Sequence, residues 1–198
     1  MGRQILQHPQ DIVAMQEITW NVRPDLIIET GIAYGGSLIF YASLLEVMGH
    51  GTVVGVEINL YKANRLAIEA HPLFNRIKIL DGSSIAYSTF AKVREIAKGK
   101  KTLVCLDSNH THDHVLRELN LYSPLVTKGS YMVVFDTMIE NLPARLFKGK
   151  PYGKGNNPAT AVREFLKTNP RFEIDKSIDD RLMASAAPEG YLKCLESD

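Results

Sequence analysis

The sequence is poor in cysteine, in tryptophan and in long apolar runs. Its 198 residues include two cysteines and one tryptophan. Cys105 and Cys194 are too few and too far apart to indicate a disulfide framework or a zinc site. No stretch approaches the roughly 18 apolar residues of a membrane-spanning helix. The first residues lack the apolar core of a secretory signal, so we expect a cytoplasmic protein.

A dominant charge is also missing. The chain has 23 Lys and Arg against 22 Asp and Glu, which leaves a net charge of +1. Bulk charge therefore gives no argument for a nucleic-acid partner. Hydrophobic residues make up 45% of the chain, an ordinary share for a globular protein. The length predicts a single domain over residues 1–198, opened by a helical segment within residues 1–23.

Strand-like and helix-like segments alternate along the chain. The predicted strands cover residues 26–28, 52–56, 77–80, 102–106, 131–135 and 172–174, and the predicted helices 10–22, 38–48, 61–70, 89–97, 113–122 and 159–167. Such alternation predicts an α/β fold with a mostly parallel sheet. Segments 182–186 and 191–195 flank the turn Pro188-Glu189-Gly190 and predict an antiparallel hairpin. A C-terminal hairpin is typical of the seven-stranded, Rossmann-like sheet of S-adenosylmethionine (SAM)-dependent methyltransferases.

An acidic residue closes each of the first five predicted strands. These residues are Glu29, Glu57, Asp81, Asp107 and Asp136. In a parallel sheet the carboxyl ends of the strands share one edge, and ligands of open α/β sheets bind there. The sequence therefore predicts a polar ligand site along that edge.

The segment between the first strand and the following helix is rich in glycine. A nucleotide-binding loop requires this position between a strand and a helix. Glycine lets a ligand approach the backbone, and the start of the helix offers free amides. The spacing G-x-x-x-G-G, with Ala33 inside it, departs from the dinucleotide fingerprint G-x-G-x-x-G and favours SAM over NAD. The predicted cofactor residues of this loop are Glu29, Thr30, Gly31, Ala33, Gly35, Gly36 and Ser37.

Three later segments extend the predicted cofactor site. Glu57 lies about 20 residues beyond the glycines, the place of an acid that accepts hydrogen bonds from ribose hydroxyls. Asp81, Gly82 and Ser83 resemble the turn that contacts adenine in methyltransferases. Asp107, like Glu29, is an acid available to the ammonium group of SAM.

A metal site and a general base are also expected at this edge. Asp107 and Asp136 end neighbouring strands about 4.8 Å apart, and carboxylates suit Mg²⁺. Such an ion lowers the pKa of a substrate hydroxyl. His110 is the first candidate for the base, ahead of His112 and His114. The histidines also fit a non-haem iron site, which the parallel α/β pattern disfavours.

Residues 137–158 interrupt the alternating pattern. The segment is long and rich in Gly, Pro and Lys, and we expect an active-site lid because long irregular loops in compact domains are mostly functional. It carries Arg145, Lys148, Lys150 and Lys154, which either meet a phosphate or carboxylate of the substrate or remain solvated.

The chain resembles the cephalosporin hydroxylase family, a group of SAM-dependent O-methyltransferase-like proteins that is similar to rhamnosyl O-methyltransferases. The matching stretches span residues 24–31 with 35–37, 106–110 with 114–116, 122–126 with 129–131, 158–159 with 164–166, 172–175 and 188–192. The resemblance covers nearly the whole chain. It implies a Rossmann-like methyltransferase fold, SAM and Mg²⁺ as cofactors, and a homo-oligomer.

Carried over by position, the resemblance marks Glu29, Gly31 and Ser37 for SAM, Glu57 for its ribose, and Asp107 and Asp136 for metal. The chain has Phe135 where the family typically has Glu, and Asn109 where the family often has Asp. Asn109, His110 and Glu140 are the candidates to replace the missing ligand.

The predicted function is SAM-dependent, Mg²⁺-assisted methylation of a hydroxyl on a small sugar or natural-product acceptor. Asp107 and Asp136 are expected to hold the ion, and His110, with Asp107, to carry the chemistry. Two alternatives stay open from the sequence. One is an NAD-dependent oxidoreductase that uses the same loop, and the other is a degenerate SAM-binding protein, which Phe135 favours.

Overall fold

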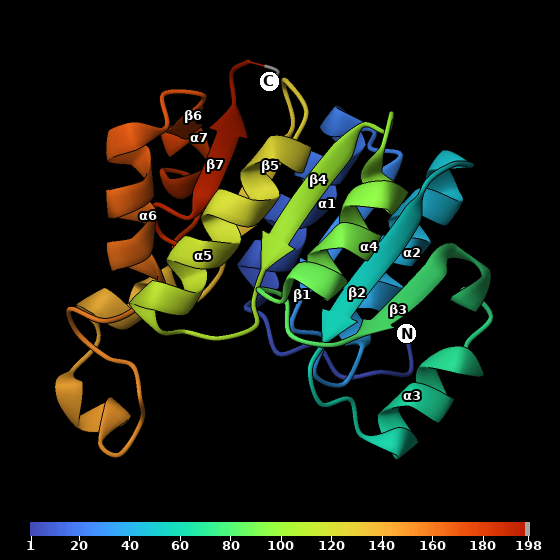
Figure 1. Cartoon of the computed structure of the whole chain (residues 1–198), viewed down its shortest axis with the longest axis horizontal. Helices are drawn as coiled ribbons and strands as arrows, with labels where there is room; N and C mark the ends of the chain where they lie inside the picture. Colours follow the sequence, from blue (N-terminus) through green and yellow to red (C-terminus); the bar gives the residue numbers. More distant parts are fainter. Residues whose placement is uncertain (197–198) are drawn as a thin grey trace.

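A twisted seven-stranded sheet forms the centre of the protein (Figure 1). The computed structural model describes residues 1–196. The strands are β1 (Leu26–Thr30), β2 (Thr52–Glu57), β3 (Ile77–Asp81), β4 (Thr102–Leu106), β5 (Tyr131–Val134), β6 (Phe172–Ile174) and β7 (Tyr191–Cys194), in the spatial order β3-β2-β1-β4-β5-β7-β6. Strands β1 to β5 pair in parallel, and β7 pairs antiparallel with both β5 and β6. The predicted, mostly parallel α/β sheet with an antiparallel C-terminal pair is confirmed.

Two layers of helices cover the sheet. The helices are α1 (Pro9–Val22), α2 (Gly36–Met48), α3 (Lys62–Glu69), α4 (Tyr87–Ala97), α5 (His112–Tyr122), α6 (Pro158–Thr168) and the short α7 (Lys176–Asp179). In Figure 1, α4 and α5 lie in front of the sheet, and α1 and α2 lie behind it. Among the described residues, no helix has the length and apolar character that crossing a bilayer requires.

Successive side chains of each strand point to opposite faces of the sheet and contribute to two separate apolar cores. In β1, Ile27 packs with side chains of α1 and α2, whereas Leu26 and Ile28 pack with side chains of α4, α5 and α6. Successive side chains of a strand point to opposite faces, so Glu29 falls on the same face as Ile27. The continuous apolar run at the start of β1 follows from this burial on both faces.

The predicted strand at residues 182–186 is wrong. The antiparallel partner of β7 is β6, which precedes α7, and residues 182–186 form no strand. The buried carboxylate of Asp11 in α1 explains the difference, because it accepts hydrogen bonds from Ser185 Oγ (2.6 Å), Ala186 N (2.7 Å) and Tyr191 Oη (2.6 Å). The segment is thus fastened to a helix behind the sheet, a tertiary contact that local sequence does not reveal.

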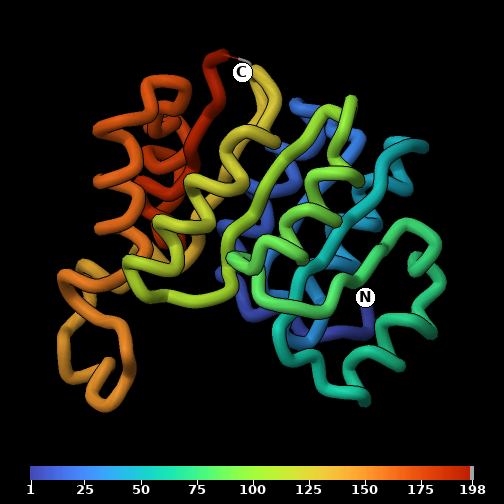
Figure 2. Tube along the Cα trace, in the orientation of Figure 1, coloured from blue at the N-terminus to red at the C-terminus, as the bar shows by residue number. Residues whose placement is uncertain are grey.

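The strand order reverses next to β1. From β1 the chain continues to β2 and β3 on one side of the sheet, and to β4 and β5 on the other. Ligands of open α/β sheets bind outside the carboxyl ends of the strands at such a switch point. Figure 2 shows the N-terminal tube crossing this same edge before it enters α1.

Candidate active site

A cavity of about 290 Å³ opens at the switch point. Its walls come from the glycine-rich loop after β1, from the residues that follow β4 and β5, and from the N-terminal segment at residues 4–7. A second, smaller cavity of about 110 Å³ shares Gly31, Glu57 and Ser108 with the first and continues toward β3. The edge that the sequence indicated is therefore hollow and not filled by side chains.

Two glycines of the loop are required by close packing. Gly31 has φ +79°, and a Cβ at this residue would lie 2.2 Å from the backbone oxygen of Asp107. At Gly36 a Cβ would lie 2.1 Å from the backbone oxygen of Gln4. Any larger side chain would separate the loop from β4 or from the N-terminal segment. The glycine pattern thus holds three parts of the chain together around the cavity.

The side-chain carboxylate of Glu57, at the end of β2, accepts hydrogen bonds from two backbone N–H groups, one of which belongs to the glycine-rich loop. One carboxylate oxygen accepts a hydrogen bond from Ile32 N and the other from Asn59 N, each at 3.1 Å. The side chain lines both cavities and stays partly exposed. Since each carboxylate oxygen can accept a second hydrogen bond, Glu57 can still meet the hydroxyls of a ligand at the junction of the two cavities.

Glu29 lies inside β1 and not after it, and it is fully buried. Ser37 Oγ donates a 2.8 Å hydrogen bond to Glu29 Oε2, while Oε1 has no partner among the described residues. Burial raises the pKa of Glu29 to about 8, the Ser37 hydrogen bond opposes the rise, and the nearby Glu57 carboxylate adds to it. A cationic group brought to this carboxyl would offset its desolvation and favour the ionised form.

Asp107, His110 and Asp136 come together beyond β4 and β5. Each offers one ligand atom, and these atoms lie within 4.8 Å of one another. His110 Nδ1 is 3.4 Å from Asp136 Oδ2. Asp136 has the left-handed φ of 59°, which is uncommon for a residue other than glycine and is often found at functional sites. Two carboxylates and one imidazole can bind a divalent cation.

The pKa of Asp107 is raised by burial and by neighbouring carboxylates. Burial raises its pKa well above the usual range, and the Asp136 and Glu29 carboxylates raise it further. A bound cation would reverse this effect, because opposite charge favours the ionised carboxylate. The acids therefore repel one another unless a positive group is placed among them.

The other two histidines of the segment have different partners. His112 Nδ1 lies 2.9 Å from Thr160 Oγ1, and its Nε2 lies 3.3 Å from a carboxylate oxygen of Glu164, so it joins α5 to α6. His114 Nε2 lies 3.1 Å from Ser84 Oγ and 3.6 Å from the buried Glu118. Of the three, His110 alone lines the larger cavity.

The remaining predicted cofactor residues lie in several different places. Gly82 and Ser83 line the smaller cavity. Asp81 is exposed, lines neither of the two cavities and pairs with Arg65 of α3. Thr30 is fully buried in β1, and its hydroxyl has no partner among the described residues. Ala33 lines the larger cavity, and Gly35 forms the N-terminal cap of α2.

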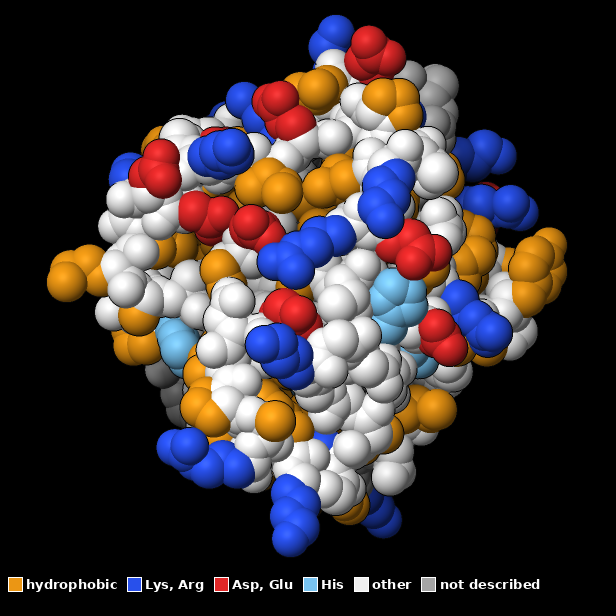
Figure 3. Space-filling view, turned by 90° about the vertical axis from the view of Figure 1, so that its left-hand side faces the viewer, with side chains coloured by type: hydrophobic (Ala, Val, Ile, Leu, Met, Phe, Trp, Pro, Cys, Tyr) orange, Lys and Arg blue, Asp and Glu red, His pale blue; other side chains and the backbone are white. Residues whose placement is uncertain are grey.

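The predicted lid projects from the body of the protein at the edge where the strands end (Figure 1). It contains two short 3₁₀ helices, η3 (Thr137–Asn141) and η4 (Ala144–Phe147). The Tyr152 ring packs edge-on against the His110 ring with centroids 5.1 Å apart, so the segment reaches the site. Its four cationic side chains are all exposed. Figure 3 views the molecule from the left-hand side of Figure 1, the side of the lid, and shows Lys and Arg without acidic side chains at the lower end of the surface.

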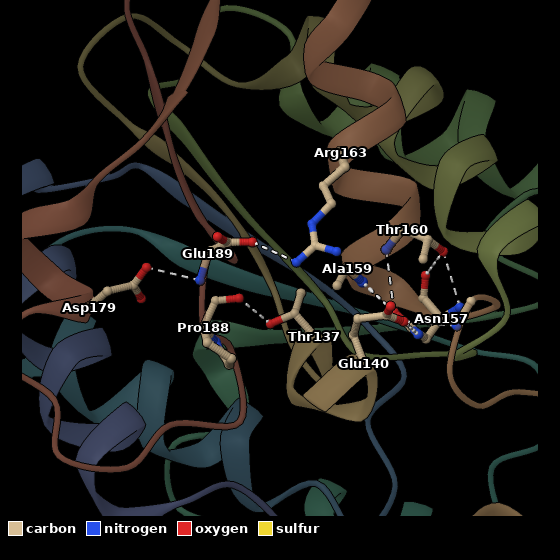
Figure 4. Close-up of polar contacts among 10 residues, drawn as sticks. Thr137, Glu140, Asn157, Ala159, Thr160, Arg163, Asp179, Pro188 and Glu189 are labelled. Carbon is tan, nitrogen blue, oxygen red and sulfur yellow. Dashed lines mark hydrogen bonds and ion pairs between the residues drawn. The ribbon is translucent and has the colours of Figure 1, made fainter. Parts of the chain in front are cut away.

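The root of the lid is fixed by polar contacts (Figure 4). Asn157 caps α6 through Ala159 N and Thr160 N, and its Nδ2 donates to Glu140 Oε2 at 2.5 Å. Glu140 also accepts a 2.8 Å hydrogen bond from Gly155 N. These two hydrogen bonds hold the pKa of Glu140 below its usual range. Glu140 is thus engaged at the lid root and does not belong to the Asp107 cluster.

The N-terminal segment is the part of the site that the sequence did not indicate. Residues 4–7 line the cavity, although nothing in their composition marks them. Arg3 fastens the segment through Nε to Tyr34 O (2.9 Å) and through Nη2 to Asn64 Oδ1 (2.8 Å).

Comparison with known proteins gives the family. The sequence profile described as rhamnosyl O-methyltransferase/CmcI matches residues 1–195. The chain belongs to this family. It is 27% identical over 195 residues to a rhamnosyl O-methyltransferase of Mycobacterium tuberculosis (strain ATCC 25618 / H37Rv), covering 97% of this chain and 76% of that protein. The enzyme of the same name from Mycobacterium leprae (strain TN) is 28% identical, with 97% and 81% covered.

Solved structures of CmcI and of a second O-methyltransferase share the fold. A structure of CmcI with Mg and SAM superposes with a TM-score of 0.67 at 18% identity, covering 97% of this chain and 74% of that one. An O-methyltransferase from Bacillus cereus in complex with SAH gives a TM-score of 0.60 at 16% identity, with 84% and 72% covered. The Rossmann-like methyltransferase architecture predicted from the sequence is therefore confirmed.

Proposed function

We propose that this family member is a SAM-dependent O-methyltransferase that methylates a hydroxyl of a sugar or natural product. The cavity at the switch point carries the proposal, because it is bounded by the glycine-rich loop on one side and by Asp107, His110 and Asp136 on the other. A methyl donor lying along the loop would present its methyl group to the acidic cluster. Membership in an O-methyltransferase family favours this reaction over hydride transfer with NAD on the same loop.

The polar atoms of the cavity fit an adenosyl amino acid. Glu57 lines both cavities, so we assign its carboxylate to the ribose hydroxyls and the smaller cavity beyond it to the base. Glu29 Oε1 is buried without a partner among the described residues, and an unsatisfied buried acceptor costs about 1–3 kcal/mol. The ammonium group of SAM would satisfy it and would also relieve the repulsion among the acids.

The acidic cluster fits a divalent cation such as Mg²⁺. We assign Asp107 and Asp136 as the residues that hold it, and the ion, when bound, lowers the pKa of the acceptor hydroxyl. His110 is assigned as the base, because Asp136 beside Nδ1 leaves Nε2 free to take the proton. Phe135 is buried at the wall of the cavity and offers no ligand atom. With Nδ1 directed to Asp136, His110 has one basic nitrogen left, and we assign that nitrogen to the proton and not to the ion.

The test is methyl transfer from radiolabelled SAM to a panel of rhamnosides and phenolic glycosides, with and without Mg²⁺. We expect wild-type protein to label at least one hydroxyl acceptor. Replacing His110 by Ala should lower kcat by about 10²–10⁴-fold, the usual contribution of a general base, with SAM affinity kept. Isothermal titration with SAM provides the independent arm, and an absence of heat at millimolar SAM would remove the proposal.

A further inference from the structure

The side-chain amide of Gln7 is a buried polar group in the cavity wall that the site described above does not use. It belongs to residues 3–7, which we call the strap because they cross the carboxyl edge of the sheet before α1 (Figure 2). Both side-chain amide atoms of Gln7 are buried and lack a hydrogen-bond partner among the described residues. A buried carboxamide without partners costs a few kcal/mol. A bound ligand that forms hydrogen bonds with it would remove this cost.

The strap is built to hold Gln7 in place. Arg3 anchors one end to Tyr34 O and to Asn64, and Asn64 Nδ2 donates in turn to Ala33 O at 3.3 Å. The backbone of Gln4 packs so tightly on the loop that only glycine fits at residue 36. The helix α1 begins at Pro9, with His8 as its N-cap between the strap and the helix. The strap is thus seated on the same loop that is proposed to bind the cofactor.

The surroundings of Gln7 indicate which part of a ligand it meets. Its amide lies near the Asp107 carboxylate and the Tyr41 hydroxyl without a hydrogen bond of normal geometry to either, and it opposes the rise in pKa that burial causes in both groups. Glu29 acts on both of these groups, and its own buried oxygen is unpartnered among the described residues. This acidic end of the cavity suits an ammonium group. A ligand carboxylate there would be repelled unless a donor faced it, and the carboxamide NH₂ is such a donor.

We propose that the strap is part of the cofactor site and that Gln7 binds the amino-acid end of an adenosyl amino acid. The carboxamide NH₂ donates to the ligand carboxylate, and its oxygen accepts from the ligand ammonium. A carboxamide suits this zwitterionic end because it is neutral and offers both donor and acceptor. The inference rests on the proposed function, since it concerns the same cavity, but it adds a residue, a segment and a chemical contact to it.

The test compares two ligands that differ only at that end. S-adenosylhomocysteine carries the amino and carboxyl groups, and 5′-methylthioadenosine lacks them. Isothermal titration would give the Kd of each for wild type and for Gln7→Leu. We expect Gln7→Leu to weaken S-adenosylhomocysteine about tenfold or more, and to change methylthioadenosine less than twofold. Gln10→Leu is the matched control, since Gln10 is exposed in the first turn of α1.

Stability gives the second readout. Without ligand, Gln7→Leu should unfold at the same or a higher urea concentration than wild type, because an apolar side chain of similar size replaces an unsatisfied buried amide. If Gln7→Leu does not fold, the burial argument is overturned, and Arg3→Met, at the partly exposed anchor of the strap, tests the strap by the same ligand comparison.

The outcomes separate the two claims. Equal binding of S-adenosylhomocysteine by wild type and Gln7→Leu overturns the role of Gln7 and leaves the proposed function intact. An equal loss for both ligands also overturns it, since Gln7 would then only shape the cavity. Absence of binding of either ligand by wild type overturns the proposed function together with this inference.

Discussion

Replacement of Glu29 by Gln should change how the stability of the ligand-free protein depends on pH. Burial raises the pKa of this carboxyl to about 8, from the ordinary value of 4.5 that applies to the unfolded chain. The contribution of Glu29 to stability is therefore fully present below pH 4.5 and is lost as pH rises toward 8. Each pH unit in this window corresponds to about 1.4 kcal/mol. Between pH 5 and pH 8 wild type should lose about 3–4 kcal/mol that Glu29→Gln retains.

The assay is urea unfolding followed by circular dichroism at several pH values from 5 to 8. The quantity to plot is the free energy of unfolding of Glu29→Gln minus that of wild type, because other titrating groups largely cancel in this difference. It should rise by about 3–4 kcal/mol across the range. Glu95→Gln, at an exposed carboxylate of α4, should give a flat line. A flat line for Glu29→Gln as well would refute the assignment of a protonated carboxyl beneath the loop.

Three further outcomes follow from the structure. Replacing Asp11 by Ala leaves three donors without their acceptor and should cost about 3 kcal/mol or more in urea unfolding, since each lost partner costs about 1–3 kcal/mol; a cost under about 1 kcal/mol would contradict the anchoring role. Asn157→Ala removes the cap of α6 and the contact with the lid root, so it should cost about 1–2 kcal/mol and speed tryptic cleavage between residues 148 and 154, whereas unchanged cleavage would argue against a fixed lid. Asp136→Asn should weaken Mn²⁺ binding, measured by electron paramagnetic resonance, about tenfold or more while Asp113→Asn does not, and equal affinities would place the ion elsewhere.

The sheet and the helices were predictable because their signals are local and periodic. The apolar runs of β1 and β4 are continuous because these strands are covered on both faces, and glycines or prolines end several of the helices. The sequence singles out Glu29, but the burial of this side chain follows from its place inside β1 and from its packing against α2, which only the packed structure reveals. Its raised pKa therefore could not be read from the sequence.

Contacts between distant segments account for what the sequence did not reveal. The segment at residues 182–186 is largely apolar and precedes the turn Pro188-Glu189-Gly190, yet Asp11, more than 170 residues away, holds it in an irregular path. The strap gives no signal in a single sequence, because its position depends on the space above Gly36. Likewise, nothing in the sequence distinguishes the three histidines after β4. In the structure His110 lines the cavity, whereas His112 contacts α6 and His114 contacts Ser84.

The central claim is that the cavity at the switch point holds a methyl donor beside a metal. A crystal structure with S-adenosylhomocysteine and Mg²⁺ tests it most directly. We predict density for the ligand along residues 31–37, with its ribose at Glu57 and an ion bonded to Asp107 and Asp136. A ligand bound at another edge of the sheet, or an empty cavity at saturating ligand, would contradict the account.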